Sequence, residues 1–182
     1  MSFPSFSAGE VLTAVDMNAV GLWLVKTQAV GTGVSSVTVS NAFSSTYDNY
    51  RVTWVGGTAS TNTPDMRLTL GSANTGYYGN LFYLRPNTTV PAGVANDNIA
   101  YWQYGAGLGT TNHIATGFDL YGPNLAKYTA VRTDVFEMVA SASAVGMYTG
   151  FQASTTQFTA FTITASTGTF TGGTIRVYGY RN

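Results

Sequence analysis

From residue 28 onward, apolar and polar residues alternate with a period of two, and clusters of Gly, Asn, Ser and Pro interrupt the alternation about every ten residues. Met66, Leu68 and Leu70, for example, alternate with Arg67 and Thr69. Strands that follow one another without helices pair mainly antiparallel, because parallel pairs need long crossover connections. The pattern therefore predicts an all-β fold, an antiparallel jelly-roll-like β-sandwich whose two sheets cover each other's apolar faces.

The alternation also predicts where the strands lie. Two segments between them, Gly56–Asn62 and Pro86–Asn98, are expected to be loops, and the second is long enough to take part in recognition. Gly172-Gly173 predicts a hairpin turn before the last strand. The expected strands are 37–39, 50–54, 66–70, Leu81–Arg85, Ala100–Tyr104, Ile114–Tyr121, Tyr128–Val139, Val145–Phe151, Phe158–Ala165 and Ile175–Tyr180.

Residues 1–27 differ from the sandwich domain expected over 28–182. Thr13-Ala14-Val15-Asp16 has the spacing of a capping box, and apolar residues recur after it at helical spacing, which predicts a short helix. Two roles are open for this helix: it covers one end of the sandwich, or it serves in oligomerisation or docking to another protein. The candidate contact residues are Val11, Leu12, Val15, Ala19, Leu22 and Trp23.

Charged residues make up only 9% of the chain, so Thr, Ser, Asn and Gly must keep its surface hydrated. The eight basic and eight acidic residues are scattered, and no Lys/Arg cluster is available to neutralise phosphates. Binding to nucleic acid is therefore not expected. The absence of cysteine excludes disulfides and thiolate metal sites. The start of the chain has no basic region and no long apolar run, so neither a signal peptide nor membrane insertion is expected.

The sequence contains no convincing set of catalytic residues. His113 is the only histidine and lies in a predicted loop, without the spacing of a catalytic triad. The closest acidic pair, Asp134 and Glu137, is three residues apart on a predicted strand, so the two carboxylates point to opposite faces. Gly105–Gly109 resembles a dinucleotide-binding loop only weakly, because no helix pattern follows it, and a flexible turn is expected. We expect no enzyme, no metal and no cofactor.

Aromatic residues gather in the middle third of the chain, near several asparagines. Two interpretations are open for them: they belong to the core or to a subunit interface, or their rings and the nearby amides bind a carbohydrate or another cell-surface ligand. Adjacent residues such as Tyr77 and Tyr78 must point to opposite faces of a strand. The candidate aromatics are Tyr77, Tyr78, Tyr83, Tyr101, Trp102 and Tyr104.

Both ends of the chain resemble bacteriophage proteins. The segment Phe6–Asn18, FSAGEVLTAVDMN, is similar to the F-x-A-G-x-V-L-T-A-x-x-M-N opening of many phage tail and virion structural proteins. The segments Gly33–Val39, Phe43–Arg51 and Gly173–Arg181 resemble a β-sandwich domain that recurs in tail-fibre and minor tail proteins. The residues from Thr58 to Thr116 carry no such resemblance.

The resemblance implies a structural protein of the virion, made in the host cytoplasm and commonly a homotrimer. The expected function is that of a small tail fibre or receptor-binding protein, which contacts itself, other virion proteins and a host-surface glycan or protein. A capsid decoration protein, which stabilises or decorates the phage head, is the alternative, because this chain has no long fibre shaft. A free carbohydrate-binding or carbohydrate-degrading protein is a third possibility.

Overall fold

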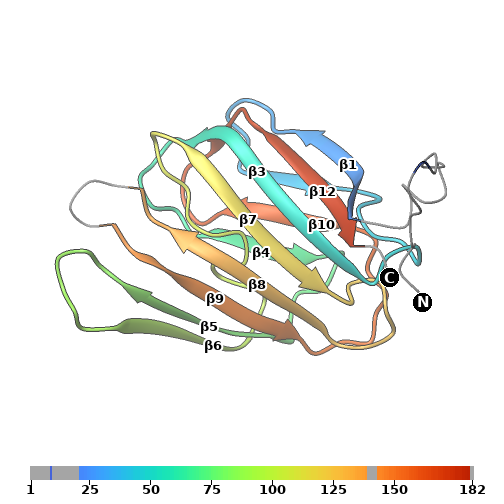
Figure 1. Ribbon diagram of the computed structural model, residues 1–182. Helices are drawn as coiled ribbons and strands as arrows, with labels where there is room; N and C mark the ends of the chain where they lie inside the picture. Colours follow the sequence, from blue (N-terminus) through green and yellow to red (C-terminus); the bar gives the residue numbers. More distant parts are fainter. Residues whose placement is uncertain (1–8, 10–20, 139–142, 181–182) are drawn as a thin grey trace.

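A computed structural model describes Gly9, residues 21–138 and residues 143–180, which form two antiparallel sheets (Figure 1). All strand pairings in these residues are antiparallel, so the predicted antiparallel β-sandwich is confirmed. The strands are β1 (Leu22–Ala29), β2 (Ser36–Val39), β3 (Asn49–Ala59), β4 (Met66–Leu70), β5 (Tyr77–Leu84), β6 (Ala92–Ile99), β7 (Ile114–Tyr121), β8 (Thr129–Phe136), β9 (Val145–Gln152), β10 (Phe161–Ala165), β11 (Phe170–Thr171) and β12 (Thr174–Tyr180).

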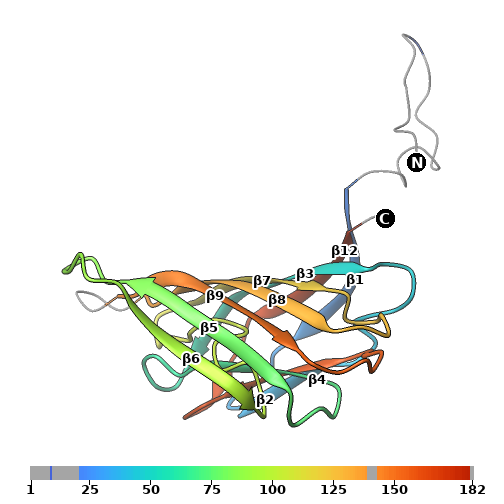
Figure 2. The same ribbon diagram turned by 90° about the horizontal axis from the view of Figure 1, so that it is seen from below.

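The strands divide unevenly between the two sheets. The large sheet has the order β1-β12-β3-β7-β8-β9-β5-β6, with the short β11 also paired to β3, and the small sheet has the order β2-β10-β4. Figure 2 shows the sheets as two layers, with β2 and β4 beneath the large sheet. A sheet of three strands cannot cover a sheet of nine, so other residues must cover part of the large sheet's inner face.

The core lies between the layers and follows from the alternation in the sequence. On β10, Phe161 and Ile163 point inward and are fully buried. Phe118 of β7 meets Phe161 edge to face, with the ring centroids 5.9 Å apart. Burial of one such ring stabilises the fold by about 1.5–3 kcal/mol, and the edge-to-face geometry adds to this.

A buried turn, Trp102–Gly109, covers the rest of the inner face beside β4. Trp102 exchanges two backbone hydrogen bonds of 3.0 Å with Leu68, and the amide of Ala106 donates to the carbonyl of Met66 at 3.0 Å. On the other side, the Thr133 hydroxyl of β8 donates to the carbonyl of Gly105 at 2.6 Å. The turn therefore continues the small layer without being a strand.

Two predictions about this turn are wrong. Ala100–Tyr104 is not a strand, because only Trp102 pairs with β4 and the chain then turns. Gly105–Gly109 is not a flexible turn, because its glycines are packed against the core. A Cβ at Gly105 would lie 2.7 Å from the Cβ of Leu68, so only glycine fits this close approach.

Two predicted loops contain strand residues. Pro86–Asn98 was expected to be a loop, but its second half belongs to β6, an edge strand whose Gly, Asn and Asp residues hide its pairing with β5. Gly56–Asn62 was also expected to be a loop, but β3 continues through a bulge near Gly57 to Ala59. The bulge separates the pairing with β12 from the pairing with β11.

The predicted helix near the start of the chain lies mostly outside the described residues, as do Val11, Leu12, Val15 and Ala19. Leu22 and Trp23, however, belong to β1 and not to a helix, because they pair with Tyr180 and Gly179 of β12. Residues 22–27, assigned to the N-terminal segment, are therefore part of the large sheet. In the described residues no helix could cross a membrane.

The prediction of a hairpin turn at Gly172-Gly173 is wrong, because β11 and β12 both pair antiparallel with β3 and run in the same direction. The two glycines, with φ angles of +72° and +85°, instead form a short irregular step between two consecutive strand segments. A Cβ at Gly173 would lie 2.6 Å from Nε1 of the buried Trp54, whereas a Cβ at Gly172 would meet nothing closer than the Gly56 carbonyl oxygen at 3.7 Å. The two glycines thus share a backbone conformation and differ in the space around them.

We therefore expect Gly172→Ala to destabilise the protein by about 1–2 kcal/mol, the cost of the left-handed backbone alone. Gly173→Ala should cost a further 1–3 kcal/mol, roughly, because the new methyl group displaces the Trp54 indole. Urea unfolding followed by tryptophan fluorescence measures both changes. If both variants lost the same amount of stability, the packing of Trp54 against Gly173 would be contradicted.

Candidate contact face and ligand pocket

The outer face of the small sheet is entirely polar. Its outward positions are occupied by serine, threonine and arginine, and the Thr38 and Thr162 hydroxyls hydrogen-bond across β2 and β10 at 2.9 Å. Arg67 of β4 places its guanidinium 4.5 Å from the centre of the Tyr101 ring. This face, hereafter the threonine face, is well suited to contact with water.

The outer face of the large sheet carries exposed apolar side chains. In register, Phe82 of β5 lies beside Met147 of β9, and Leu84 of β5 lies beside Val145 of β9 and then Phe136 of β8. These five side chains are between 40% and 58% exposed. Together they form a contiguous group, hereafter the outer patch.

Three aromatic rings extend the apolar surface at the other end of the same strands. Tyr78 stacks on Phe151 with the ring centroids 4.8 Å apart, and Phe151 stacks on Tyr128 at 6.2 Å. The planes of the rings differ by only 11° and 10°. Tyr128 is 60% exposed, so this aromatic stack presents an edge to solvent.

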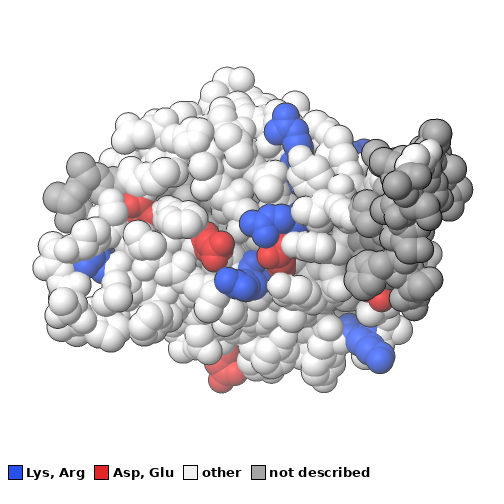
Figure 3. All heavy atoms as spheres, viewed as in Figure 1, with Lys and Arg blue, Asp and Glu red and all other residues white. Residues whose placement is uncertain are grey.

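Charged side chains gather near the middle of the large sheet's outer face, where Figure 3 shows blue and red surface surrounded by white. Arg51, Asp119 and Arg132 are neighbours in register on β3, β7 and β8. Arg51 pairs with Asp119 at 3.3 Å, and the Tyr180 hydroxyl donates to the same carboxylate at 2.9 Å. Charges of opposite sign therefore alternate beside the outer patch.

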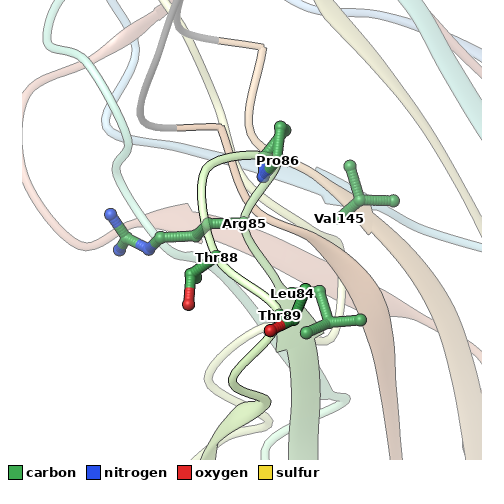
Figure 4. A pocket seen from close by; sticks show the side chains of 6 residues that line it. All are labelled: Leu84, Arg85, Pro86, Thr88, Thr89 and Val145. Atoms are coloured by element: carbon green, nitrogen blue, oxygen red, sulfur yellow. The ribbon is translucent and has the colours of Figure 1, made fainter.

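Two open hollows adjoin the outer patch. One, of about 240 Å³, lies over Gly117 between Arg51, Asp134 and Phe136. The other, of about 370 Å³, is formed by the loop after β5 together with Leu84 and Val145 (Figure 4). In Figure 4, Arg85 points its guanidinium away from Val145, so this second hollow is mainly apolar.

A third, smaller pocket of about 150 Å³ lies between the inner face of β5 and β6 and the buried turn. Two tyrosines, Tyr83 and Tyr104, line it together with the carboxylates of Asp65 and Glu137. Arg85 also lines it and places its guanidinium 5.7 Å from the centre of the Tyr83 ring. Leu81, Val94, Leu108 and Ala144 supply apolar walls.

A chain of hydrogen bonds holds one side of this pocket. The Tyr148 hydroxyl donates to Asn96 at 3.0 Å, Asn96 donates to Gln103 at 3.0 Å, and Gln103 donates to Oδ2 of Asp65 at 2.9 Å. Burial raises the pKa of Tyr104, and the charges of Asp65, Tyr83 and Glu137 raise it further. The Tyr104 hydroxyl therefore stays protonated and can donate a hydrogen bond.

The six candidate aromatics do not form one site. Tyr77 and Trp102 are fully buried in the core, where their rings meet edge to face at 5.1 Å. Tyr78 points to the opposite face, as the alternation predicts, and joins the aromatic stack. Tyr101 packs with Arg67 of β4 and does not line the pocket. Only Tyr83 and Tyr104 share a pocket.

The acidic pair considered from the sequence is separated as expected. Asp134 points outward beside the Gly117 hollow, whereas Glu137 lines the pocket on the inner side. That Asp65 and Glu137 line one pocket could not be predicted from the sequence, because the two residues are far apart along the chain. His113 is partly exposed before β7, and its amide donates to the Thr110 hydroxyl at 3.1 Å.

Within residues 21–138 and 143–180, no three His, Cys, Asp or Glu side chains are grouped closely enough to hold a metal ion. Comparison with known protein families, with curated proteins and with solved structures finds no match to this chain.

Two core tyrosines predict how stability changes at high pH. Burial raises the pKa of Tyr77 to about 12 and also raises that of Tyr148. An unfolded chain releases these protons near pH 10, so the folded state keeps its full stability below pH 10 and loses it as the pH rises toward 12. By pH 11 the loss from Tyr77 alone should be about 1.4 kcal/mol.

Urea unfolding from pH 8 to pH 11.5 measures this loss. Tyr77→Phe should be less stable at pH 8, because the Leu70 amide donates to the Tyr77 hydroxyl at 2.7 Å and would lose its acceptor. Its stability should nevertheless fall less steeply above pH 10 than that of the unmodified protein. Parallel curves for the two proteins would show that Tyr77 does not control the alkaline transition.

Proposed function

We propose that this chain is a structural protein of a bacteriophage particle, a small homotrimeric tail fibre or receptor-binding protein that works through surface contact. Copies associate through the outer patch, the segment before β1 binds other virion proteins, and the remaining exposed surface meets the host. Threefold repetition turns weak binding at single sites into avidity. The observation that carries the proposal is the contrast between the apolar outer patch and the threonine face.

The size of the apolar surface supports an association role. Phe82, Tyr128, Phe136 and Phe151 are 43–60% exposed, and since a free ring presents roughly 200 Å², these four alone expose on the order of 400 Å². This is the size of the largest apolar patch on a typical monomer, about 300–600 Å², and such a patch is often functional. A stable interface takes about 800 Å² from each partner, so the proposed interface also includes polar surface around these rings.

The similarity of Phe6–Asn18 to the opening of phage virion proteins supports the assignment to a phage particle. It also supports a docking role for the segment that contains Val11, Leu12, Val15 and Ala19. The charge-poor surface fits a protein that contacts other surfaces over large areas, because charged residues are depleted at the centres of interfaces.

The two-sided architecture also favours a second function, that of a capsid decoration protein. In that role the outer patch lies against capsid subunits and the threonine face points to solvent. Antibody labelling of purified phage particles, observed by electron microscopy, separates the two functions. Label at the tail supports the fibre or receptor-binding role, label over the head supports decoration, and particles without label contradict both.

For the isolated protein, we expect sedimentation velocity to show an oligomer that depends on the outer patch. Phe82→Ser should weaken self-association at least about tenfold, because it removes an apolar anchor of about 1.4 kcal/mol or more from the interface. Val90→Ser is the matched control, since Val90 is 70% exposed in the loop between β5 and β6 and does not belong to the patch. A monomer at all concentrations, or equal effects of both substitutions, would contradict association through the patch.

A further inference from the structure

The pocket between β5, β6 and the buried turn brings together charged groups on the inner side of the large sheet. The chain has only eight acidic and eight basic residues, yet Asp65, Glu137 and Arg85 all line this pocket of about 150 Å³. Partial burial of such groups costs free energy unless they are paired. Convergent polar groups in an otherwise apolar pocket are typical of a ligand site.

The polar groups are held in position before any ligand arrives. Asp65 is oriented by Gln103, which is in turn held by Asn96 and by the buried Tyr148. Opposite them, the amide of Ala144 donates to Oε2 of Glu137 at 3.0 Å. One oxygen of each carboxylate is therefore engaged by the protein, and preorganisation of this kind reduces the entropy lost on binding.

The charges restrict what the pocket can bind. Asp65 and Glu137 repel an anion, and Arg85 offsets part of their attraction for a cation, so the ligand that satisfies charged groups of both signs is a neutral one with hydroxyl groups. The carboxylates need hydrogen-bond donors, while Arg85 needs acceptors, and a hydroxyl group provides both. The rings of Tyr83 and Tyr104 offer apolar faces to C–H groups. A molecule that combines several hydroxyls with an apolar ring face is a sugar.

We propose that this pocket binds one neutral pyranose ring of a glycan. Its volume corresponds to about five waters, so it holds a single ring and leaves neighbouring sugars outside. Asp65 and Glu137 accept hydrogen bonds from the sugar hydroxyls, the Tyr104 hydroxyl donates to one of them, and Tyr83 covers the ring. That the glycan belongs to the host surface rests on the proposed function, whereas the binding itself does not.

Ligand-observed NMR on the full chain tests the proposal with the methyl pyranosides of glucose, galactose, mannose and N-acetylglucosamine. At least one should bind with a Kd on the order of 1 mM, as expected for a single weak site. Glucuronate and glucosamine are the charged probes and should bind more weakly than the neutral sugar. Binding of none of the neutral pyranosides, or stronger binding of either charged probe, would overturn the proposal.

Variants then locate the binding. Asp65→Asn, Glu137→Gln and Tyr104→Phe should each weaken the sugar at least fivefold while the unfolding midpoint in urea shows that the protein is folded. Asp97→Asn is the matched control, because Asp97 is exposed on β6 and does not line the pocket. Sugar binding that all three variants retain would overturn the assignment to this pocket. Antibody labelling of the particles tests the proposed function separately, so sugar binding and the role in the phage particle can be contradicted independently of each other.

Discussion

The buried turn Trp102–Gly109 is the contact on which both the sandwich and its pocket depend. The three strands of the small sheet cannot cover the nine of the large sheet, and this turn covers part of the remaining inner face. Backbone hydrogen bonds to Met66 and Leu68 and a hydrogen bond from the Thr133 hydroxyl hold it in place. Because the turn is not a strand, its side chains need not alternate between two faces. It can therefore place Trp102 in the core and turn Gln103 and Tyr104 toward the neighbouring pocket.

Alternation in the sequence was enough to predict most of the large sheet. On β7, every second residue from Ile114 to Leu120 is buried, as the period of two requires. Prediction failed where pairing is decided by distant residues. The edge strand β6 is rich in Gly, Asn and Asp and pairs only because β5 lies beside it, and Leu22 and Trp23 pair with the far end of the chain. A pattern read over a few neighbouring residues cannot identify such distant pairing partners.

The site could be predicted only in part. Alternation predicts which side of a strand a residue occupies, but it does not predict which residues from other segments lie beside it. It correctly separated Tyr77 from Tyr78 and Asp134 from Glu137. It could not reveal that Asp65 and Glu137 line the same pocket, since these residues come from segments that the fold alone brings together. The six aromatic residues lie close together in sequence, whereas the fold distributes them over the core, the aromatic stack, the pocket and, for Tyr101, a contact with Arg67.

The scarcity of charge gives the surface features a common explanation. A protein with few charges can keep its surface hydrated through hydroxyl groups, as the threonine face does. A low content of charged residues therefore does not explain why apolar side chains are exposed on the large sheet. Threonine would serve equally well at the positions of Phe82 or Phe136, which do not contribute to the core. Because the fold does not require these rings, their exposure supports the proposed contact with another surface.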